Sequence, residues 1–386
     1  MKYFVVALHF YQPPTQDLAI TQQILESCYL PLLRMLNEKK NFKITFNLSG
    51  SLLEQLEKLH ATEFFELTKK LIDDGKVQLV SSIMYHSLLP LINSDTFERG
   101  VRKNSRIIER LISTKTPVGF FPPELAVDEK SLDSFQNTVL FVSEDAVTKH
   151  SPSSIPIFSY KTNTLLIGNK KIINLFRAYP KKLDIQKVFS FINKEFPKES
   201  LFILPNDSEL FGHHYSERLK LLADLLDSSE VAFLSIKEAV AQFGKDMPVI
   251  RKINLSSWQN TNELDLWTKN TLQKKYLKLA KLATELTKKE ESKEVFHYLD
   301  KGWSSCYFYW LSNWPWWYPD IVESGAKNLI KSVRSCAHLS YEEKTRAEKL
   351  YFSLLSEIWQ YHWSGEVEKN YELYEKALNA SKNRGV

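Results

Sequence analysis

A carboxylate that follows two prolines is the first feature of this sequence that could do chemistry. Glu124 ends the apolar run at residues 119–123, which reads Gly-Phe-Phe-Pro-Pro. Proline fixes its own backbone angle and donates no hydrogen bond, so this run presents the Glu124 side chain rigidly. Taken alone, Glu124 could equally be an ordinary glutamate in a salt bridge.

A second group of ionisable side chains follows the apolar run at residues 201–204. The loop at residues 205–214 reads Pro-Asn-Asp-Ser-Glu-Leu-Phe-Gly-His-His, so Asp207, Glu209 and His213 lie close together. Taken alone, Asp207 could simply cap a helix.

A pair of carboxylates at neighbouring strand ends suits the cleavage of a glycosidic bond. One carboxylate attacks the anomeric carbon, while the other must be protonated to assist the leaving oxygen. Different environments can keep one group charged and the other neutral at the same pH. The distance between Glu124 and Asp207, which the sequence does not give, decides between retention and inversion.

The segments that must position these residues predict an α/β fold up to about residue 245. Short β-rich apolar runs, typical of buried parallel strands, alternate with amphipathic helical segments. The expected strands are 3–10, 43–48, 77–81, 118–121, 138–142, 172–176, 201–204 and 231–234. The main expected helices between and after them are 18–36, 96–111 and 236–243, with further helices between 49 and 74.

Polar residues recur just after these strands, which favours an incomplete parallel barrel over an open sheet. His9, Glu124, Asp145 and Asp207 each lie at or just beyond the C-terminal end of an expected strand. Barrels of this kind carry their catalytic groups at those ends. A doubly wound sheet is the alternative architecture.

The composition changes after about residue 250. All nine tryptophans lie between Trp258 and Trp363. Long helical periods occupy residues 267–290, 293–309, 319–337 and 340–363. We therefore expect a catalytic barrel domain at residues 1–248, followed by a helical domain at residues 249–386 that contributes aromatic side chains to the cleft.

The overall composition excludes several classes of protein. Hydrophobic residues make up 43% of the 386 residues, which favours a packed core over disorder. The net charge of +5 is small, and the lysines of residues 269–289 read as a solvated helix face, so a nucleic-acid partner is not expected. Nothing reaches the length of a membrane span or resembles a signal peptide.

The three cysteines indicate a reducing compartment. Cys28, Cys306 and Cys336 have neither metal-ligand spacing nor the even count of a disulfide framework. We expect buried thiols, no cofactor or metal, and a cytoplasmic protein. The sequence does not indicate an oligomeric state.

Around its two carboxylate segments the sequence resembles glycoside hydrolase family 57. The most specific match is residues 206–213, which resemble the family's Asp-x-Glu-x-Phe-Gly-His stretch, and residues 121–126 match the segment that holds its nucleophile. The resemblance implies an incomplete (β/α)7 barrel followed by a helical domain. It also implies a retaining mechanism, with Glu124 as nucleophile and Asp207 as general acid/base.

Three other segments carry the resemblance. Residues 9–13 resemble the opening His-x-His-Gln-Pro, with Tyr11 in place of the second histidine, and residues 82–90 resemble a substrate-binding segment. In the helical domain, residues 256–258 and 311–317 resemble tryptophan-bearing segments, with Asn313 where an aspartate is common. By this resemblance the residues that bind substrate or support the acid/base are His9, Tyr11, Gln12, His86, Glu209, His213, Trp258, Trp314 and Trp316.

The resemblance predicts a retaining glycoside hydrolase or transglycosylase that acts on α-linked oligo- or polysaccharides, with an α-glucan as the first expectation. The family includes amylases, 4-α-glucanotransferases, branching enzymes and α-galactosidases, so an α-galactosidase is one alternative. A catalytically silent carbohydrate-binding relative is another, because of the changes at Tyr11 and Asn313. A third is a metal-dependent enzyme resembling polysaccharide deacetylases, in which His9, His86, His213 and His214 would gather round a metal.

Overall fold

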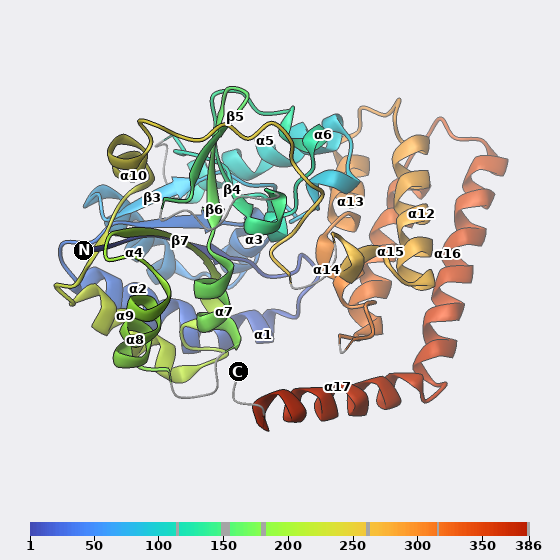
Figure 1. Ribbon diagram of the computed structural model, residues 1–386. Coiled ribbons are helices and arrows are strands. Elements are labelled where there is room, and N and C mark those ends of the chain that lie inside the picture. Colours follow the sequence, from blue (N-terminus) through green and yellow to red (C-terminus); the bar gives the residue numbers. More distant parts are fainter. Residues whose placement is uncertain (113–115, 148–154, 179–182, 260–262, 315, 384–386) are drawn as a thin grey trace. The chain divides into compact units, whose positions relative to one another are not determined.

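The chain forms two compact units. The computed structural model describes residues 1–112, 116–147, 155–178, 183–259, 263–314 and 316–383 (Figure 1). The first unit takes residues 1–12, 16–84 and 89–258, and the second takes residues 13–15, 85–88 and 259–386. The domain boundary expected at residues 248 and 249 stays a prediction, and each unit is described separately below.

A parallel sheet forms the centre of the first unit. Its middle strand is β1 (Lys2–Phe10), which pairs in parallel with β2 (Ile44–Leu48), β7 (Ser200–Asp207) and β8 (Val231–Phe233). Strand β3 (Val77–Val80) pairs in parallel with β2. Almost every residue of β1 is buried, as expected for a strand that is covered on both faces.

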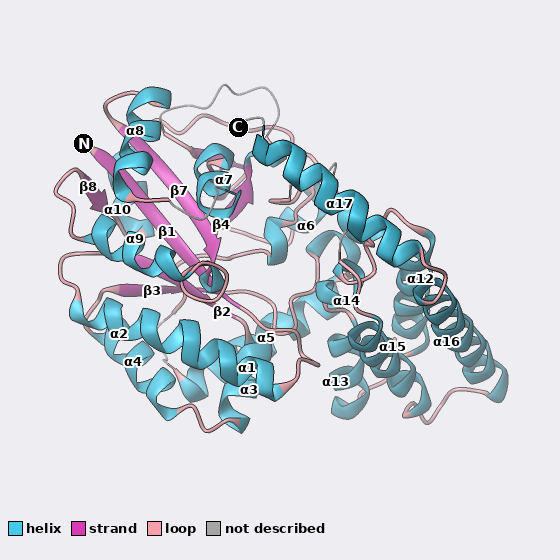
Figure 2. Ribbon diagram, turned by 90° about the horizontal axis from the view of Figure 1, so that it is seen from below, coloured by secondary structure: helices cyan, strands magenta, loops and turns pink. Residues whose placement is uncertain are grey.

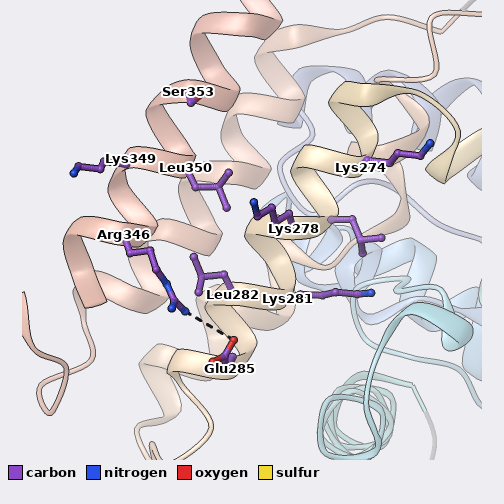
Figure 3. Close-up of a pocket in the computed structure, with 10 residues that line it drawn as sticks. Lys274, Lys278, Lys281, Leu282, Glu285, Arg346, Lys349, Leu350 and Ser353 are labelled. Carbon is purple, nitrogen blue, oxygen red and sulfur yellow. Dashed lines mark ion pairs between the residues drawn. The ribbon is translucent and has the colours of Figure 1, made fainter. Parts of the chain in front are cut away.

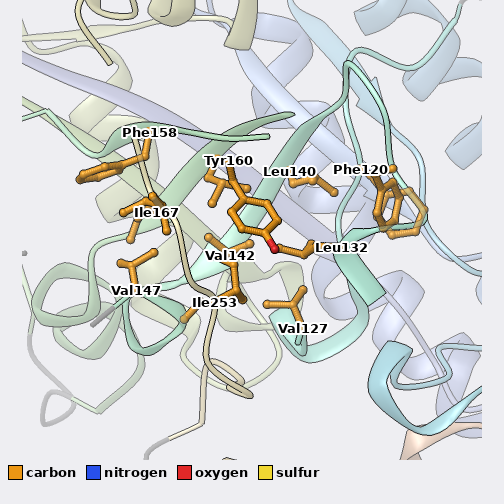
Figure 4. Packing of buried hydrophobic residues seen from close by; sticks show 14 of the residues in the cluster. Phe120, Val127, Leu132, Leu140, Val142, Val147, Phe158, Tyr160, Ile167 and Ile253 are labelled. Carbon is orange, nitrogen blue, oxygen red and sulfur yellow. The ribbon is translucent and has the colours of Figure 1, made fainter. Parts of the chain in front are cut away.

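A smaller sheet of three strands lies in the same unit. Strands β4 (Val139–Ser143) and β6 (Asn163–Gly168) are parallel, and β5 (Ile157–Tyr160) forms an antiparallel hairpin with β6. Phe158 and Tyr160 of β5 pack with Val142 of β4 and Ile253 in one apolar cluster (Figure 4).

Single contacts connect the two sheets. Phe120 forms isolated parallel bridges to Ser81, just beyond β3, and to Leu140 of β4. At the other side, the backbone N–H of Asn169, just after β6, donates to the carbonyl of Ile203 in β7 at 3.1 Å. The strands of the two sheets are therefore joined at both sides.

Helices surround these strands (Figure 2). The aromatic ring of Phe10 on β1 packs against Phe46 of β2 and against Tyr29 and Phe64 of the helical layer. Burying a side chain of this size contributes about 1.5–3 kcal/mol. The helices are α1 (Leu18–Ile24), α2 (Leu30–Glu38), α3 (Gly50–Lys58), α4 (Thr62–Asp73), α5 (Ser94–Leu111), α6 (Glu129–Leu132), α7 (Lys170–Ala178), α8 (Ile185–Glu195), α9 (Ser216–Leu226) and α10 (Ile236–Phe243), with a π-helical turn, Leu25–Tyr29, between α1 and α2.

The described part of the second unit is helical. Helix α13 packs against α15, and α12 and α16 pack against each other. Its helices are α11 (Asp265–Thr268), α12 (Thr271–Leu286), α13 (Lys293–Gly302), α14 (Ser305–Tyr309), α15 (Pro319–Arg334), α16 (Tyr341–His362) and α17 (Glu366–Asn383).

The structure confirms an α/β fold with a parallel sheet and a helical C-terminal part, but it corrects individual elements. The strand expected at residues 172–176 is wrong, because these residues lie within helix α7. The strand expected at residues 118–121 is reduced to the bridges of Phe120. The hairpin of β5 and β6 was not expected from the sequence. Among the described residues, none of the helices has both the length and the apolar character of a membrane span.

Candidate active site

The register of the parallel sheet aligns three polar side chains at one end. His9 is opposite Asn47 of β2 on one side and opposite Asp207 of β7 on the other. His9 Nδ1 lies 2.6 Å from Asn47 Oδ1, and its ring stacks on Phe121 with ring centroids 5.1 Å apart. Burial lowers the pKa of His9, although the negative charge of Asp207 opposes this shift. His9 is therefore a buried, oriented residue in the floor of the site.

Glu124 lies in an unusual backbone conformation at the same end of the unit. It belongs to the 3-10 turn Pro123–Leu125, and its φ of 58° is in the left-handed region that non-glycine residues rarely adopt. Such a conformation costs about 1–3 kcal/mol and is found at functional sites. Two backbone hydrogen bonds hold the turn. The N–H of Leu125 donates to the carbonyl of Pro122 at 2.8 Å. The N–H of Trp258 donates to the carbonyl of Glu124 at 2.9 Å.

Trp258 also contacts the side chain of Glu124. The indole Nε1–H of Trp258 donates to Glu124 Oε2 at 2.7 Å. The indole also contacts Arg177, whose guanidinium carbon lies 4.1 Å from the centre of the ring. A cation over a tryptophan face is stabilised by the ring quadrupole.

Arg177 in turn holds Asp207. Its Nη2 donates to Asp207 Oδ2 at 2.8 Å, and both side chains are largely buried, with 19% and 30% exposed. Glu124, Trp258, Arg177 and Asp207 therefore form one continuous chain of contacts. The two carboxylates predicted to be catalytic are connected through two side chains.

Arg177 was not expected from the sequence. The strand predicted at residues 172–176 hid the helical turn that carries this residue. Ile172, Ile173 and Phe176 are buried on one face, a helical spacing that could have indicated α7 and placed Arg177 at its end.

Glu209 is buried and contacts Gln12 and Tyr29. Glu209 Oε1 accepts hydrogen bonds from the hydroxyl of Tyr29 and from Nε2 of Gln12, the latter at 3.0 Å. Burial, followed by the negative charge of Asp207, raises the pKa of Glu209 to about 8. Gln12 and Glu209 are thus bonded to each other within the floor of the site.

The pKa of Glu209 predicts a dependence of stability on pH. Because the folded-state pKa of about 8 exceeds the ordinary value of 4.5, the folded protein retains a proton that the unfolded chain releases. The contribution of this proton to the free energy of unfolding is complete below pH 4.5 and is lost as the pH rises to about 8. The free energy of unfolding therefore falls by up to roughly 4–5 kcal/mol over this range.

Thermal denaturation of wild type and Glu209→Gln tests this expectation. Between about pH 5 and about pH 8 the Tm of wild type should fall more than that of the variant, which keeps a neutral side chain at every pH. Parallel Tm curves for the two proteins would show that Glu209 is ionised throughout.

The remaining predicted residues of the first unit lie close to this group. The ring of Tyr11 stacks on that of His9 with centroids 5.8 Å apart, and His213 is exposed beside His214. Gly212 precedes them with a φ of 145°, and a Cβ there would approach the carbonyl oxygen of Ser27 to 2.9 Å. Glycine is therefore required at the turn that presents these histidines.

His86 and two of the predicted tryptophans belong to the second unit. His86 is buried, with a φ of 59°, and its Nδ1 lies 2.8 Å from the hydroxyl of Ser305. Trp314 and Trp316 are 46% and 38% exposed. Asn313 has a φ of 56°, a left-handed conformation that asparagine tolerates better than most residues. Substrate contacts by His86, Trp314 and Trp316 stay predictions, and Pro315 lies outside the described residues.

The lysine-rich segment near residues 269–289 lines a groove of about 750 Å³ in the second unit, between α12 and α16. Figure 3 shows Leu282 and Leu350 between the two helices, while Lys281 and Lys349 point outward. The carboxylates of the candidate site do not line this groove.

His9, His213 and His214, three of the four histidines of the metal-dependent alternative, lie in the first unit. Among its described residues, no three histidine, cysteine or acidic side chains bring their ligand atoms close enough to share one ion. The proposed metal ligand His9 instead contacts Asn47 and Phe121.

Known structures share this fold. The 4-alpha-glucanotransferase from Thermococcus litoralis superposes with a TM-score of 0.71 at 14% identity, covering 86% of this chain and 60% of that one. The GH57-type branching enzyme from Pyrococcus horikoshii superposes with a TM-score of 0.66 at 15% identity, covering 92% and 93% of the two chains. These likenesses define the class of fold.

The family follows from the sequence itself. The profile described as Glycosyl hydrolase family 57 matches residues 3–255, so the chain belongs to this family. A curated relative, Alpha-amylase 1 from Dictyoglomus thermophilum, is 30% identical over 123 residues, which are 32% of this chain and 18% of that protein. The matched segment thus spans less than a fifth of this relative's length.

Proposed function

We propose that the protein is a retaining glycoside hydrolase or transglycosylase that acts on α-linked glucans. The observation that carries the proposal is the chain of contacts from Glu124 through Trp258 and Arg177 to Asp207. It fixes two carboxylates, one from each of the segments that resemble the family's catalytic stretches, within one compact unit. The family membership and the names of the relatives support an α-glucan as the substrate.

The proposed reaction proceeds in two displacements. A carboxylate oxygen of Glu124 attacks the anomeric carbon and forms a glycosyl ester, while Asp207 gives its proton to the departing glycosidic oxygen. Asp207 then takes a proton from the incoming acceptor, whose oxygen displaces Glu124 from the anomeric carbon. Water as the acceptor gives hydrolysis, and a sugar hydroxyl gives transfer.

The neighbours of the two carboxylates have distinct roles in this proposal. Trp258 orients Glu124 through its indole N–H, and Arg177 orients Asp207 through the hydrogen bond from its Nη2. Both groups are pre-positioned, so little reorganisation is needed when the substrate binds. In this proposal His9 and Glu209 are buried supporting residues of the site.

We further propose that the strands form an incomplete (β/α)7 barrel. The pairings of the two sheets and the contacts of Phe120 and Asn169 that join them support this architecture. Strand β1 has partners on both sides. His9 and Asp207 lie at the C-terminal ends of β1 and β7, and Glu124 follows the bridges of Phe120; barrels place catalytic groups at such strand ends.

A substrate panel tests the proposed function. Purified protein is incubated with maltooligosaccharides, amylose and an aryl α-galactoside, and the products are separated by chain length. Shortened chains indicate hydrolysis, longer chains indicate transfer, and release from the galactoside alone moves the specificity to galactose. Sugar binding without any conversion would contradict the proposal and identify a binding protein.

The hydrogen bond from Trp258 gives a further prediction. Trp258→Phe retains an aromatic face for Arg177 but removes the donor to Glu124. Because a hydrogen bond to a charged group is lost, kcat is expected to fall about 10- to 100-fold. Trp359→Phe is the matched control, because it removes an equivalent 3.0 Å indole hydrogen bond to Glu323 in the second unit. Equal losses in both variants would exclude a specific role for Trp258.

A further inference from the structure

Three potential metal ligands that take no part in the candidate active site meet in the helical unit. Glu290 lies in the loop between α12 and α13, and Cys336 and His338 follow α15. Their ligand atoms lie within 4.8 Å of one another. Cys336 Sγ is 3.2 Å from Glu290 Oε2, His338 Nδ1 is 3.5 Å from the same oxygen, and Cys336 Sγ is 3.5 Å from His338 Nδ1.

Two of these separations match the edges of a tetrahedral zinc site. Zinc bonds of about 2.3 Å to sulfur and about 2.0–2.2 Å to nitrogen and oxygen, at tetrahedral angles, separate sulfur from nitrogen or oxygen by about 3.5–3.7 Å and nitrogen from oxygen by about 3.3–3.5 Å. The Sγ–Nδ1 and Nδ1–Oε2 distances of 3.5 Å agree with these values, while the Sγ–Oε2 distance of 3.2 Å is about 0.3 Å shorter, the spacing of a thiol that donates a hydrogen bond to the carboxylate. Three protein ligands thus occupy one face of a tetrahedron, and the fourth position is left for water.

The surroundings hold two of the three ligands, Glu290 and Cys336, in place. Glu290 Oε1 accepts the backbone N–H groups of Glu291 and Ser292 at 3.0 and 3.1 Å, which directs Oε2 toward the thiol. The N–H of Cys336 donates to the carbonyl of Val333 at 3.2 Å, so the cysteine is fixed to the end of α15. Cys336 is buried while the His338 side chain is 41% exposed, which gives an ion a path from solvent.

We propose that Glu290, Cys336 and His338 bind one zinc ion. A thiolate, an imidazole and a carboxylate together suit Zn²⁺, whereas Mg²⁺ and Ca²⁺ prefer oxygen ligands alone. On binding, the Cys336 thiol releases its proton to solvent and its sulfur bonds to the metal. The ion connects the loop after α12 to the end of α15. The cysteine spacing gave no indication of this site, because Glu290 lies 46 residues before Cys336.

Titration of the reduced, metal-free full chain with Co²⁺ tests the proposal directly. Cobalt replaces zinc at such sites, and a bond from thiolate to Co²⁺ gives a charge-transfer absorption in the near ultraviolet. We expect this band to saturate at one equivalent and to disappear when Zn²⁺ is added. Wild type without the band, or with cobalt bound through nitrogen and oxygen only, would overturn the proposal.

Two variants and one control test the ligands Cys336 and His338. Cys336→Ser should lose the charge-transfer band, while the control Cys306→Ser, which removes another buried thiol of the same unit, should keep it. His338→Ala changes an exposed side chain, so the fold is expected to survive, and cobalt binding should weaken at least about 10- to 100-fold. A band that survives in Cys336→Ser, or His338→Ala with undiminished affinity, would refute the assignment. None of these measurements depends on turnover of a sugar.

Discussion

Replacement of Glu124 by alanine is expected to lower kcat/KM by on the order of 10⁴-fold or more, the largest effect of any substitution proposed for this chain. Without this carboxylate no oxygen is in position to form the glycosyl ester, and the reaction through that intermediate stops. Initial rates on the best substrate of the panel measure the effect, with circular dichroism to establish that the variant is folded.

Two further measurements make the result specific to a nucleophile. Azide can enter the space left by Glu124→Ala and attack the anomeric carbon directly, which should restore turnover and give a glycosyl azide of inverted configuration. Glu129→Gln, which changes an exposed acid nearby, is the control and should retain activity. Full activity of Glu124→Ala would remove Glu124 from the mechanism.

The second largest effect is expected for Asp207→Asn. Loss of a general acid/base costs about 10²–10⁴-fold, and it should appear on substrates whose leaving group needs protonation, such as maltooligosaccharides. A dinitrophenyl α-glucoside has a leaving group that departs without a proton, so its first step should be much less affected. A burst of dinitrophenolate followed by slow turnover would show both roles in one experiment.

Asp145→Asn is the matched control for Asp207. Asp145 was also predicted to follow a strand, but its carboxylate pairs with Lys170 at 2.6 Å and is not part of the chain of contacts at the site. The control should behave as wild type on both substrates. Equal losses on maltooligosaccharides and on the dinitrophenyl glucoside in Asp207→Asn would contradict a proton-transfer role.

Much of the fold of the first unit could be predicted from short hydrophobic patterns in the sequence. Apolar runs correctly located β1, β2, β3, β4, β7 and β8, because buried parallel strands leave near-continuous hydrophobic segments. The prolines next to Glu124 predicted a fixed backbone, and the structure places Glu124 in a left-handed conformation, which no propensity encodes. The roles of Glu124 and Asp207 came from resemblance and stay predictions until they are measured.

The residues that were missed depend on contacts between distant segments. Arg177 reaches Asp207 and Trp258 across large separations in sequence, and a short apolar run at residues 172–176 reads as strand or helix by periodicity alone. The hairpin of β5 and β6 was not predicted, because its residues directly follow a segment whose apolar residues have no clear periodicity. Glu290 became a candidate metal ligand only when folding placed it beside Cys336.

Glu124 is expected to become covalently bonded to the sugar, and trapping that intermediate tests the mechanism most directly. A fluorinated α-glucosyl fluoride, whose fluorines slow the second displacement, is incubated with wild type, and digested peptides are mapped by mass spectrometry. We predict one sugar per chain, attached to Glu124, and no label in Glu124→Ala. A label on any other carboxylate, or turnover of natural substrate with inverted anomeric configuration, would contradict the account.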